Sequence, residues 1–166
     1  MSATAVDIQL IVFDVDGVLT DGRFAYGREG KQTKSFGPDD ADALRLLTAV
    51  APIAFVSADH RGFPISKRRI DGDMGHELTL VSSDRRLSWM AERGPLEHVA
   101  YMGDSFTDIP ILRAVGIGIT TADALPGVRD AATYVTQRRG GDRAVAEACF
   151  YLLVEQFGRT EWAGIV

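Results

Sequence analysis

Several features are scarce in this 166-residue sequence, and each scarcity excludes a class of protein. A single cysteine, Cys149, rules out an internal disulfide and fits a reducing compartment. No apolar run approaches the roughly 20 residues of a membrane-spanning helix. Residues 1–7 lack the basic start and the long apolar middle of a signal peptide. We therefore expect a cytoplasmic protein with no membrane partner.

Positive charge is also in short supply, with 18 lysines and arginines against 23 aspartates and glutamates, a formal net charge of -5. Nucleic acid is not an expected partner, because proteins that bind it present a basic surface. An anionic substrate would instead need local positive charge from a metal ion and a few basic side chains. The hydrophobic share of 46% and the charged share of 25% are ordinary, so residues 1–166 are expected to form one domain.

The most informative stretch is an apolar run that ends in two carboxylates. Residues 8–13 read Ile-Gln-Leu-Ile-Val-Phe, and Asp14, Val15, Asp16 and Gly17 follow. Without polar alternation, the run favours a buried central strand of a parallel sheet, and ligands bind at the carboxyl ends of such strands. There one carboxylate can attack a substrate while its neighbour, or that neighbour's carbonyl, holds a proton or a metal. An aspartate-rich turn without chemistry is the alternative.

Residues 13–22, Phe-Asp-Val-Asp-Gly-Val-Leu-Thr-Asp-Gly, resemble the first signature of the haloacid dehalogenase superfamily of phosphohydrolases. The resemblance implies that Asp14 is the nucleophile and that Asp16 is the general acid and base. It also predicts further signatures downstream.

Two short segments within residues 22–36 flank a glycine-containing turn and predict a β-hairpin. An isolated two-stranded ribbon is marginal in water, so the hairpin either lies on its own domain or pairs with another subunit. A helix is expected after Pro38, and a buried strand over residues 52–56.

Ser57, at the end of that second strand, stands where the superfamily has its second signature. Its hydroxyl can donate a hydrogen bond to a phosphoryl oxygen, although a serine there is ordinarily a turn former. Only about 40 residues separate Asp14 from Ser57, which leaves no room for a cap domain. An uncapped site is open to water unless a neighbouring subunit closes it.

The third signature of the superfamily is a lysine near the start of a helix, here predicted over residues 85–93. No lysine lies there, and Arg86, which precedes the apolar Leu87, is assigned to the role in preference to Arg85. A guanidinium supplies the charge, but its fork is bulkier and its donors are set differently.

The fourth signature is acidic, and the strand predicted over residues 98–102 leads into a similar Gly103-Asp104-Ser105-Phe106-Thr107-Asp108. The resemblance implies that Asp104 binds Mg²⁺ together with Asp14 and the carbonyl of Asp16, a set of oxygen ligands that suits this ion. Asp108 either belongs to the metal site or only places a negative charge at a helix N-terminus.

The regular alternation of strands and helices predicts an α/β fold with helices on both faces of a parallel sheet. In full, this is a Rossmann-like three-layer sandwich without a cap and with a protruding hairpin after the first strand. Near the C-terminus, Arg139, Gly140 and Gly141 can hold an anion with backbone N–H groups, or form only a flexible connection. Asp142 can cap the apolar helix that follows.

The 3-deoxy-D-manno-octulosonate 8-phosphate phosphatase branch, which includes nonulosonate 9-phosphate phosphatases, is resembled in three features: the hairpin, the missing cap, and Arg139-Gly140-Gly141 with Ala144, Val145 and Glu147. Ser57-Ala58-Asp59 departs from the usual Thr-Gly-Arg or Thr-Gly-Glu of this branch. The resemblance implies a Mg²⁺-dependent phosphatase that hydrolyses such a keto-deoxy sugar acid phosphate through an aspartyl-phosphate, in lipopolysaccharide biosynthesis. The small anionic phosphosugar would be bound by Ser57, Arg86 and residues 139–141.

The same branch implies a homotetramer, in which the hairpins and the C-terminal tails, here residues 158–166, help to enclose neighbouring sites. A frayed terminus is the equal alternative for the tail. Two other functions remain open at this point: a non-catalytic phosphosugar-binding or oligomerisation protein of the same fold, and a phosphatase for other small phosphorylated metabolites.

Overall fold

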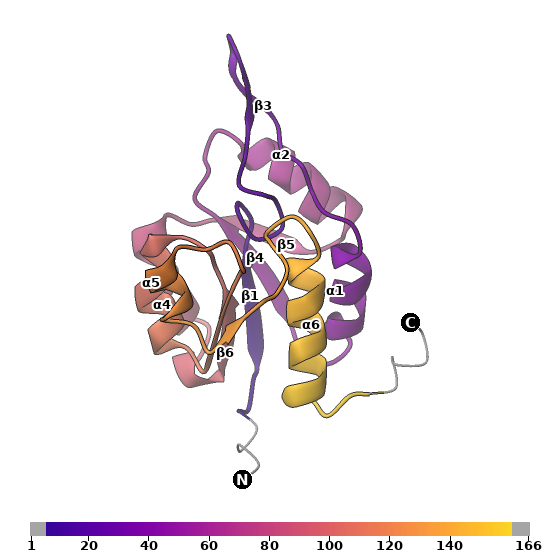
Figure 1. Cartoon of the computed structure of the whole chain (residues 1–166), viewed down its shortest axis with the longest axis vertical. Coiled ribbons are helices and arrows are strands. Elements are labelled where there is room, and N and C mark those ends of the chain that lie inside the picture. Colours follow the sequence, from indigo (N-terminus) through magenta and orange to yellow (C-terminus); the bar gives the residue numbers. More distant parts are fainter. Residues whose placement is uncertain (1–5, 161–166) are drawn as a thin grey trace.

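The chain forms a six-stranded parallel sheet flanked by helices, seen in a computed structural model that describes residues 6–160 (Figure 1). The sheet order is β5-β4-β1-β6-β7-β8, and every pairing is parallel. These strands are β1 (Leu10–Asp14), β4 (Ile53–Ser57), β5 (Glu77–Leu80), β6 (Val99–Met102), β7 (Ile117–Thr120) and β8 (Tyr134–Val135). The predicted α/β fold is confirmed.

The α-helices are α1 (Asp40–Thr48), α2 (Phe63–Lys67), α3 (Arg86–Ala91), α4 (Ile109–Ala114), α5 (Pro126–Arg129) and α6 (Ala144–Glu155). Four short turns of other helical types accompany them: η1 (Arg68–Asp73), η2 (Ser83–Arg85), η3 (Leu96–His98) and η4 (Phe106–Asp108).

The central strand β1 is covered on both faces, which explains why its sequence shows no polar alternation. On one face Phe13 belongs to a core with Leu44 of α1 and Leu152 of α6. On the other face Val12 belongs to a second core with side chains of α3, α4 and α5. Because side chains alternate along a strand, consecutive apolar residues fill both cores and produce the three-layer arrangement.

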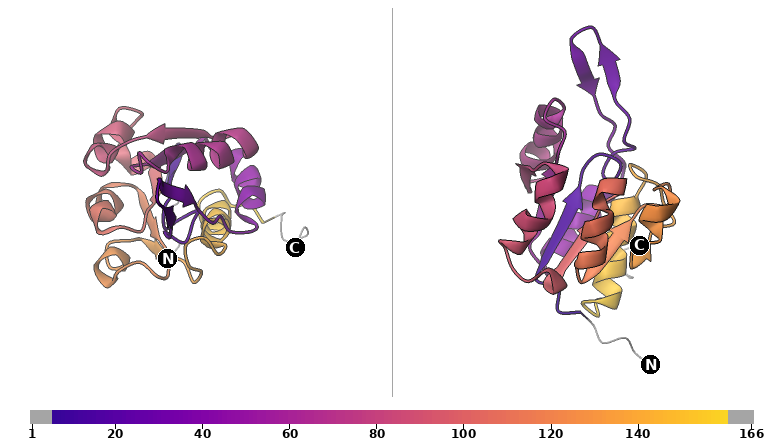
Figure 2. Two further views of the ribbon diagram at one scale, coloured as in Figure 1. Left: turned by 90° about the horizontal axis from the view of Figure 1, so that it is seen from above. Right: turned by 90° about the vertical axis from the view of Figure 1, so that its left-hand side faces the viewer.

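A two-stranded hairpin, β2 (Ala25–Gly27) and β3 (Gly30–Thr33), lies in the connection between β1 and α1. It rises beyond the carboxyl ends of the sheet and projects from the rest of the molecule (Figures 1 and 2). No cap domain separates β1 from α1, as the short spacing in the sequence predicts.

Helix α6 begins with a contact from a distant part of the chain. Its Ala146 N–H donates to Oδ1 of Asp40, the first residue of α1, over 2.9 Å. Asp142, the predicted cap, instead accepts a hydrogen bond from the Arg143 side chain. The capping prediction is therefore wrong, because the packing of α1 beside α6 brings a closer carboxylate to the helix terminus (Figure 1).

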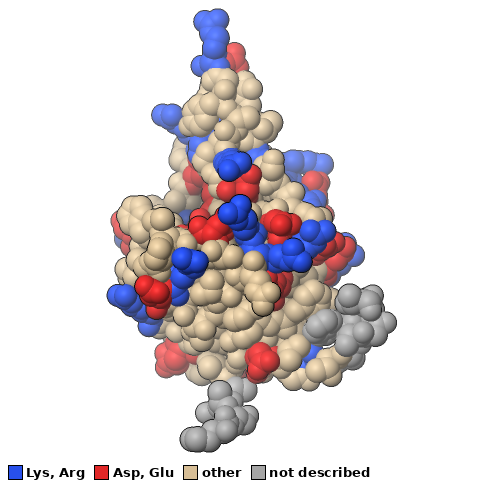
Figure 3. All heavy atoms as spheres, viewed as in Figure 1, with Lys and Arg blue, Asp and Glu red and all other residues tan. Residues whose placement is uncertain are grey.

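Charged side chains of both signs lie interleaved on the face shown in Figure 3, around the base of the hairpin and the loops above α1 and α6. The lower part of this face is largely uncharged. Within residues 6–160, no helix has the length and apolar character needed to cross a membrane.

Candidate active site

Asp14, the last residue of β1, is buried with its carboxylate held by one guanidinium. Arg86 Nη2 donates to Asp14 Oδ1 over 3.0 Å, and Nη1 lies 2.9 Å from Oδ2, so the two nitrogens span both carboxylate oxygens. The Val15 N–H also donates to Oδ1. Burial raises the pKa of Asp14 to about 6, with Arg86 opposing and Asp108 adding to the rise. Arg86 is itself buried, whereas Arg85 is exposed.

Asp108 also holds Arg86, through the same nitrogen Nη1 that pairs with Asp14. Its Oδ1 accepts hydrogen bonds from Arg86 Nη1 at 3.1 Å and from the Tyr101 hydroxyl at 2.7 Å. Its Oδ2 accepts from the backbone N–H of Ser105 at 3.0 Å. Burial raises the pKa of Tyr101 well above its ordinary value, so the phenol remains a donor. Both oxygens of Asp108 thus orient neighbouring groups.

Asp104 completes an acidic cluster with Asp14 and Asp108, in which one oxygen of each lies within 4.8 Å of the others. Burial, helped by the charges of Asp14 and Asp108, raises the pKa of Asp104 to about 8. The single guanidinium of Arg86 offsets only one of these three negative charges. A divalent cation fits beside Asp14 and Asp104, since it takes carboxylate oxygens and relieves their mutual repulsion, while both oxygens of Asp108 already accept hydrogen bonds.

Asp16 lies outside that cluster and faces a different partner. Its Oδ1 is 2.7 Å from Nζ of Lys34, a residue that follows β3 of the hairpin. Its Oδ2 accepts a 3.4 Å hydrogen bond from Ser57 Oγ at the tip of β4. Lys34 also lies 2.9 Å from Asp59 Oδ2. Three parts of the chain therefore meet around Asp16: the loop after β1, the end of the hairpin and residues 57–59.

Gly17 allows this convergence because it has no side chain. Its φ of 85° lies in the left-handed region, and a Cβ built there would stand 1.9 Å from Asp104 Oδ2. A Cβ on Gly140 would stand 1.9 Å from the Gly17 carbonyl oxygen. The loop after β1 is thus packed between Asp104 and the segment before α6.

The backbone donors predicted to hold an anion at Gly140 and Gly141 have partners within the fold. Gly140 N–H donates to Asp123 Oδ1, and Gly141 N–H donates to the Val18 carbonyl, at 3.1 and 3.0 Å. Arg139 is exposed. These two N–H groups are thus used within the fold, because the segment packs on the β1 loop, and anion binding by residues 139–141 stays a prediction.

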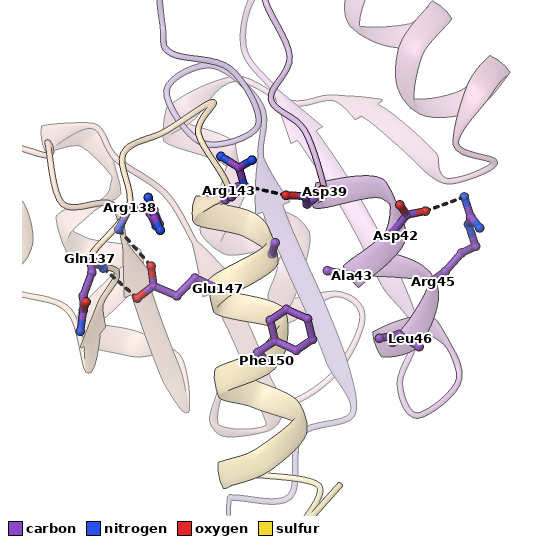
Figure 4. Close-up of a pocket in the computed structure, with 11 residues that line it drawn as sticks. Asp39, Asp42, Ala43, Arg45, Leu46, Gln137, Arg138, Arg143, Glu147 and Phe150 are labelled. Carbon is purple, nitrogen blue, oxygen red and sulfur yellow. Dashed lines mark hydrogen bonds and ion pairs between the residues drawn. The ribbon is translucent and has the colours of Figure 1, made fainter. Parts of the chain in front are cut away.

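A cleft of about 260 Å³ lies over the acidic residues, and Asp14, Asp16, Phe24, Asp59, Arg86, Asp104 and Thr107 are among the residues that line it. A larger groove of about 930 Å³ lies elsewhere, between α1 and α6 (Figure 4). Its lining includes Leu46 and Phe150, with ion pairs such as Arg143–Asp39 at its rim. The chemistry of the carboxylates assigns the site to the smaller cleft.

Comparison with known proteins agrees with this geometry. Residues 91–148 match the model of the haloacid dehalogenase-like hydrolase family. The chain is 33% identical over 157 residues to the 3-deoxy-D-manno-octulosonate 8-phosphate phosphatase KdsC of Yersinia pestis, covering 92% of this chain and 83% of that protein. The chain belongs to the haloacid dehalogenase-like hydrolases. It is a phosphatase of this family, similar to the octulosonate 8-phosphate enzymes.

Solved structures place the fold in the same family. A probable YrbI family phosphatase from Pseudomonas syringae pv. phaseolica superposes with a TM-score of 0.85 at 35% identity, covering 96% of this chain and 92% of that one. The 3-deoxy-D-manno-octulosonate 8-phosphate phosphatase from Moraxella catarrhalis, in complex with magnesium, phosphate and the octulosonate, gives a TM-score of 0.84 at 27% identity. It covers 96% and 94% of the two chains.

Sequence reasoning missed Lys34, Asp59 and Tyr101 as members of the site. A tyrosine inside a buried strand needs a hydrogen-bond partner for its hydroxyl, so the sequence did indicate that Tyr101 contacts a polar group. No local sequence signal pointed to Lys34. This residue follows the hairpin, and its contact with Asp16, 18 residues earlier, forms only in the folded chain.

Proposed function

We propose that the chain is a Mg²⁺-dependent phosphomonoester hydrolase that acts through an aspartyl-phosphate on a phosphorylated keto-deoxy sugar acid. The substrate class is 3-deoxy-D-manno-octulosonate 8-phosphate or a related nonulosonate 9-phosphate. One observation carries the proposal: the buried carboxylate of Asp14 is held by both terminal nitrogens of Arg86 beside Asp104.

In the first step, an oxygen of Asp14 attacks the phosphorus in line with the ester oxygen. With a pKa of about 6, Asp14 is mostly ionised at neutral pH. The P–O ester bond breaks as Asp16 gives its proton to the leaving sugar oxygen. Ser57 and Arg86 donate hydrogen bonds to the phosphoryl oxygens, on which negative charge is concentrated.

In the second step, Asp16 takes a proton from a water molecule, which attacks the phosphorus of the aspartyl-phosphate. The bond between Asp14 and phosphorus breaks, inorganic phosphate leaves, and Asp16 is again protonated for the next cycle. Asp108 keeps Arg86 aligned through both steps.

Asp104, Asp14 and the carbonyl of Asp16 would hold Mg²⁺. When bound, the ion supplies positive charge that stabilises the phosphoryl oxygens. The magnesium and phosphate named in the Moraxella catarrhalis complex support this choice of ion and substrate.

The sugar acid and the assembly are proposed on two grounds. The relatives named as octulosonate 8-phosphate phosphatases cover nearly the whole chain, which supports this substrate and a role in lipopolysaccharide biosynthesis. The projecting hairpin, with Tyr26 60% exposed, supports a homotetramer in which hairpins cover neighbouring clefts. Of the tail proposed to do the same, residues 161–166 lie outside the described residues.

Phosphate release from a panel of esters tests the proposal: the octulosonate 8-phosphate, a nonulosonate 9-phosphate, common sugar phosphates and p-nitrophenyl phosphate, each with Mg²⁺ and with chelator. We expect the highest kcat/KM for a keto-deoxy sugar acid phosphate, and only with Mg²⁺. Acid-quenched enzyme should carry one phosphoryl group on the peptide containing Asp14. Equal rates in chelator, or a phosphoryl group on another peptide, would contradict the mechanism. A preference for ordinary sugar phosphates would contradict the substrate.

A further inference from the structure

Lys34 joins the hairpin to the loop that follows β1. Its side chain is 0% exposed, although a lysine is normally found at the surface. The ammonium lies 2.7 Å from Asp16 Oδ1, 2.9 Å from Asp59 Oδ2 and 2.9 Å from Ser66 Oγ. The ammonium donates a hydrogen bond to Ser66 Oγ and forms ion pairs with the two carboxylate oxygens. The nitrogen is therefore fixed from three directions.

The two oxygens of Asp16 differ because of this contact. Oδ1 is bound by the ammonium, whereas Oδ2 has only the longer 3.4 Å contact with Ser57 Oγ. The Asp16 side chain lines the cleft together with Asp14 and is 21% exposed. Oδ2 is thus the oxygen left to exchange a proton with a group in the cleft.

We infer that Lys34 is a positioning residue for the leaving-group proton: it holds Asp16 through Oδ1 and so presents Oδ2 to the departing ester oxygen. The inference rests on the proposed function and adds to it a residue from the hairpin. The proton moves from Asp16 Oδ2 to the sugar oxygen as the P–O bond breaks, and the product is a neutral alcohol. Lys34 itself keeps its charge and transfers nothing.

Two kinds of leaving group separate positioning from mere structural support. An alkyl oxygen leaves poorly unless it is protonated, whereas p-nitrophenolate is a stable anion and needs little help. The value of kcat/KM reports the steps up to leaving-group departure. A misplaced Asp16 therefore lowers kcat/KM for a sugar phosphate far more than for p-nitrophenyl phosphate.

The test compares the ratio of these two kcat/KM values in K34M, K34Q and K34R. The sugar phosphate is the one that the wild-type enzyme hydrolyses fastest in the panel above. We expect K34M and K34Q to lower kcat/KM at least about 100-fold for the sugar phosphate and less than about 3-fold for p-nitrophenyl phosphate. K34R, which restores the cation, should recover at least about tenfold of the loss.

Lys31 provides a matched control from the same hairpin. It pairs with Asp59 at 2.6 Å and lies 3.6 Å from the centre of the Phe24 ring. K31M removes a similar ammonium and disturbs the same carboxylate of Asp59, but it leaves the ion pair between Lys34 and Asp16 in place. The ratio of the two kcat/KM values should therefore be unchanged in K31M.

The ratio does not depend on the folded fraction, because both substrates are measured on one preparation. The inference is overturned if K34M and K34Q slow both substrates equally, or if K31M shifts the ratio as much as they do. The first result makes Lys34 structural only, and the second assigns the effect to the hairpin as a whole. Failure of the proposed function is a separate result, seen as turnover that persists in D14N.

Discussion

The two halves of the active site are built in different ways. Asp14, Arg86, Tyr101 and Asp108 lie at or beside strand ends, are almost fully buried, and hold one another through short hydrogen bonds. In the opposite half, Asp16 pairs with Lys34, which directly follows the projecting two-stranded hairpin. The core thus holds Asp14, the proposed nucleophile, while a more peripheral element holds Asp16, the proposed proton donor. Substitution of Asp14 or Arg86 should accordingly lower activity more than substitution of the residues around Asp16.

The largest effect is expected from D14N. An amide at the end of β1 cannot attack phosphorus, so kcat should fall at least about 10⁴-fold while the thermal unfolding transition is retained. D21N is the matched control, because the exposed Asp21 in the same loop accepts a hydrogen bond from the Arg23 N–H. Steady-state phosphate release measures both variants. More than about one per cent of wild-type turnover in D14N would remove Asp14 from the role of nucleophile.

R86K should have the next largest effect and tests the superfamily's usual lysine in this chain. One ammonium cannot span both oxygens of Asp14 and also reach Tyr101 and Asp108, so kcat should fall about 100-fold. The exposed neighbour gives the control R85K, which should remain within about twofold of wild type, as surface substitutions usually have small effects. Wild-type turnover in R86K would show that the charge alone suffices.

Magnesium should stabilise the folded chain through the acidic cluster, and more strongly at pH 8 than at pH 5. Asp104 has a pKa of about 8 in the folded chain against its ordinary 3.8. The folded state therefore binds more protons, and the metal-free chain loses stability as the pH rises from about 4 to about 8. At about 100 times its dissociation constant, Mg²⁺ adds about 2.7 kcal/mol and raises Tm by several degrees.

Thermal unfolding with and without Mg²⁺ at the two pH values measures this effect. D104N is the variant that should lose it, because a neutral amide removes both the proton and the charged ligand. An equal Tm shift in D104N would place the ion elsewhere.

The smallest effect is expected in the hairpin half, from D59N. Burial alone would raise the pKa of Asp59, but hydrogen bonds from Lys31, Lys34 and the Gly62 N–H lower it to about 2. The stabilisation is therefore present above the ordinary pKa of 3.8 and is lost as the pH falls from there toward 2. D59N should lower the free energy of unfolding by about 1.5 kcal/mol at pH 7. It should also make that free energy depend less steeply on pH below 3.8, the acid arm of the stability curve.

Urea unfolding at pH 7 and at several acid pH values measures the D59N effect. D42N serves as the control, since the exposed Asp42 pairs only at the surface with Arg45. An acid arm in D59N as steep as in the wild type would mean that Asp59 is not the group that titrates.

The fold and the strand-end half of the site could be predicted because their signals are local. An apolar run fixes β1, Asp14 and Asp16 follow it directly, and Gly103 with Asp104 ends β6 in the same way. The contacts of the other half join residues far apart in sequence, such as Lys34 with Asp16 and with Asp59. Side-chain pairing of this kind leaves no periodicity or motif, and so Lys34 was not predicted.

The same limit applies near the C-terminus. Gly140 and Gly141 looked like free donors, and Asp142 looked like a helix cap, because each was judged by its sequence neighbours. The N–H groups of Gly140 and Gly141 donate instead to Asp123 and Val18, and the N-terminus of α6 donates to Asp40 through the Ala146 N–H. Glu147 was included in the predicted branch pattern, and it accepts hydrogen bonds from the backbone of residues 137 and 138 (Figure 4).

The packing of Gly17 between Asp104 and Gly140 has a consequence for biosynthesis. Asp14 is translated within the first tenth of the chain, but the loop beside it can pack against Gly140 only after that residue has left the ribosome. A nascent chain therefore carries the proposed nucleophile long before the loop beside it is fully packed. Hydrolytic competence should arise late, in a single step near the end of translation.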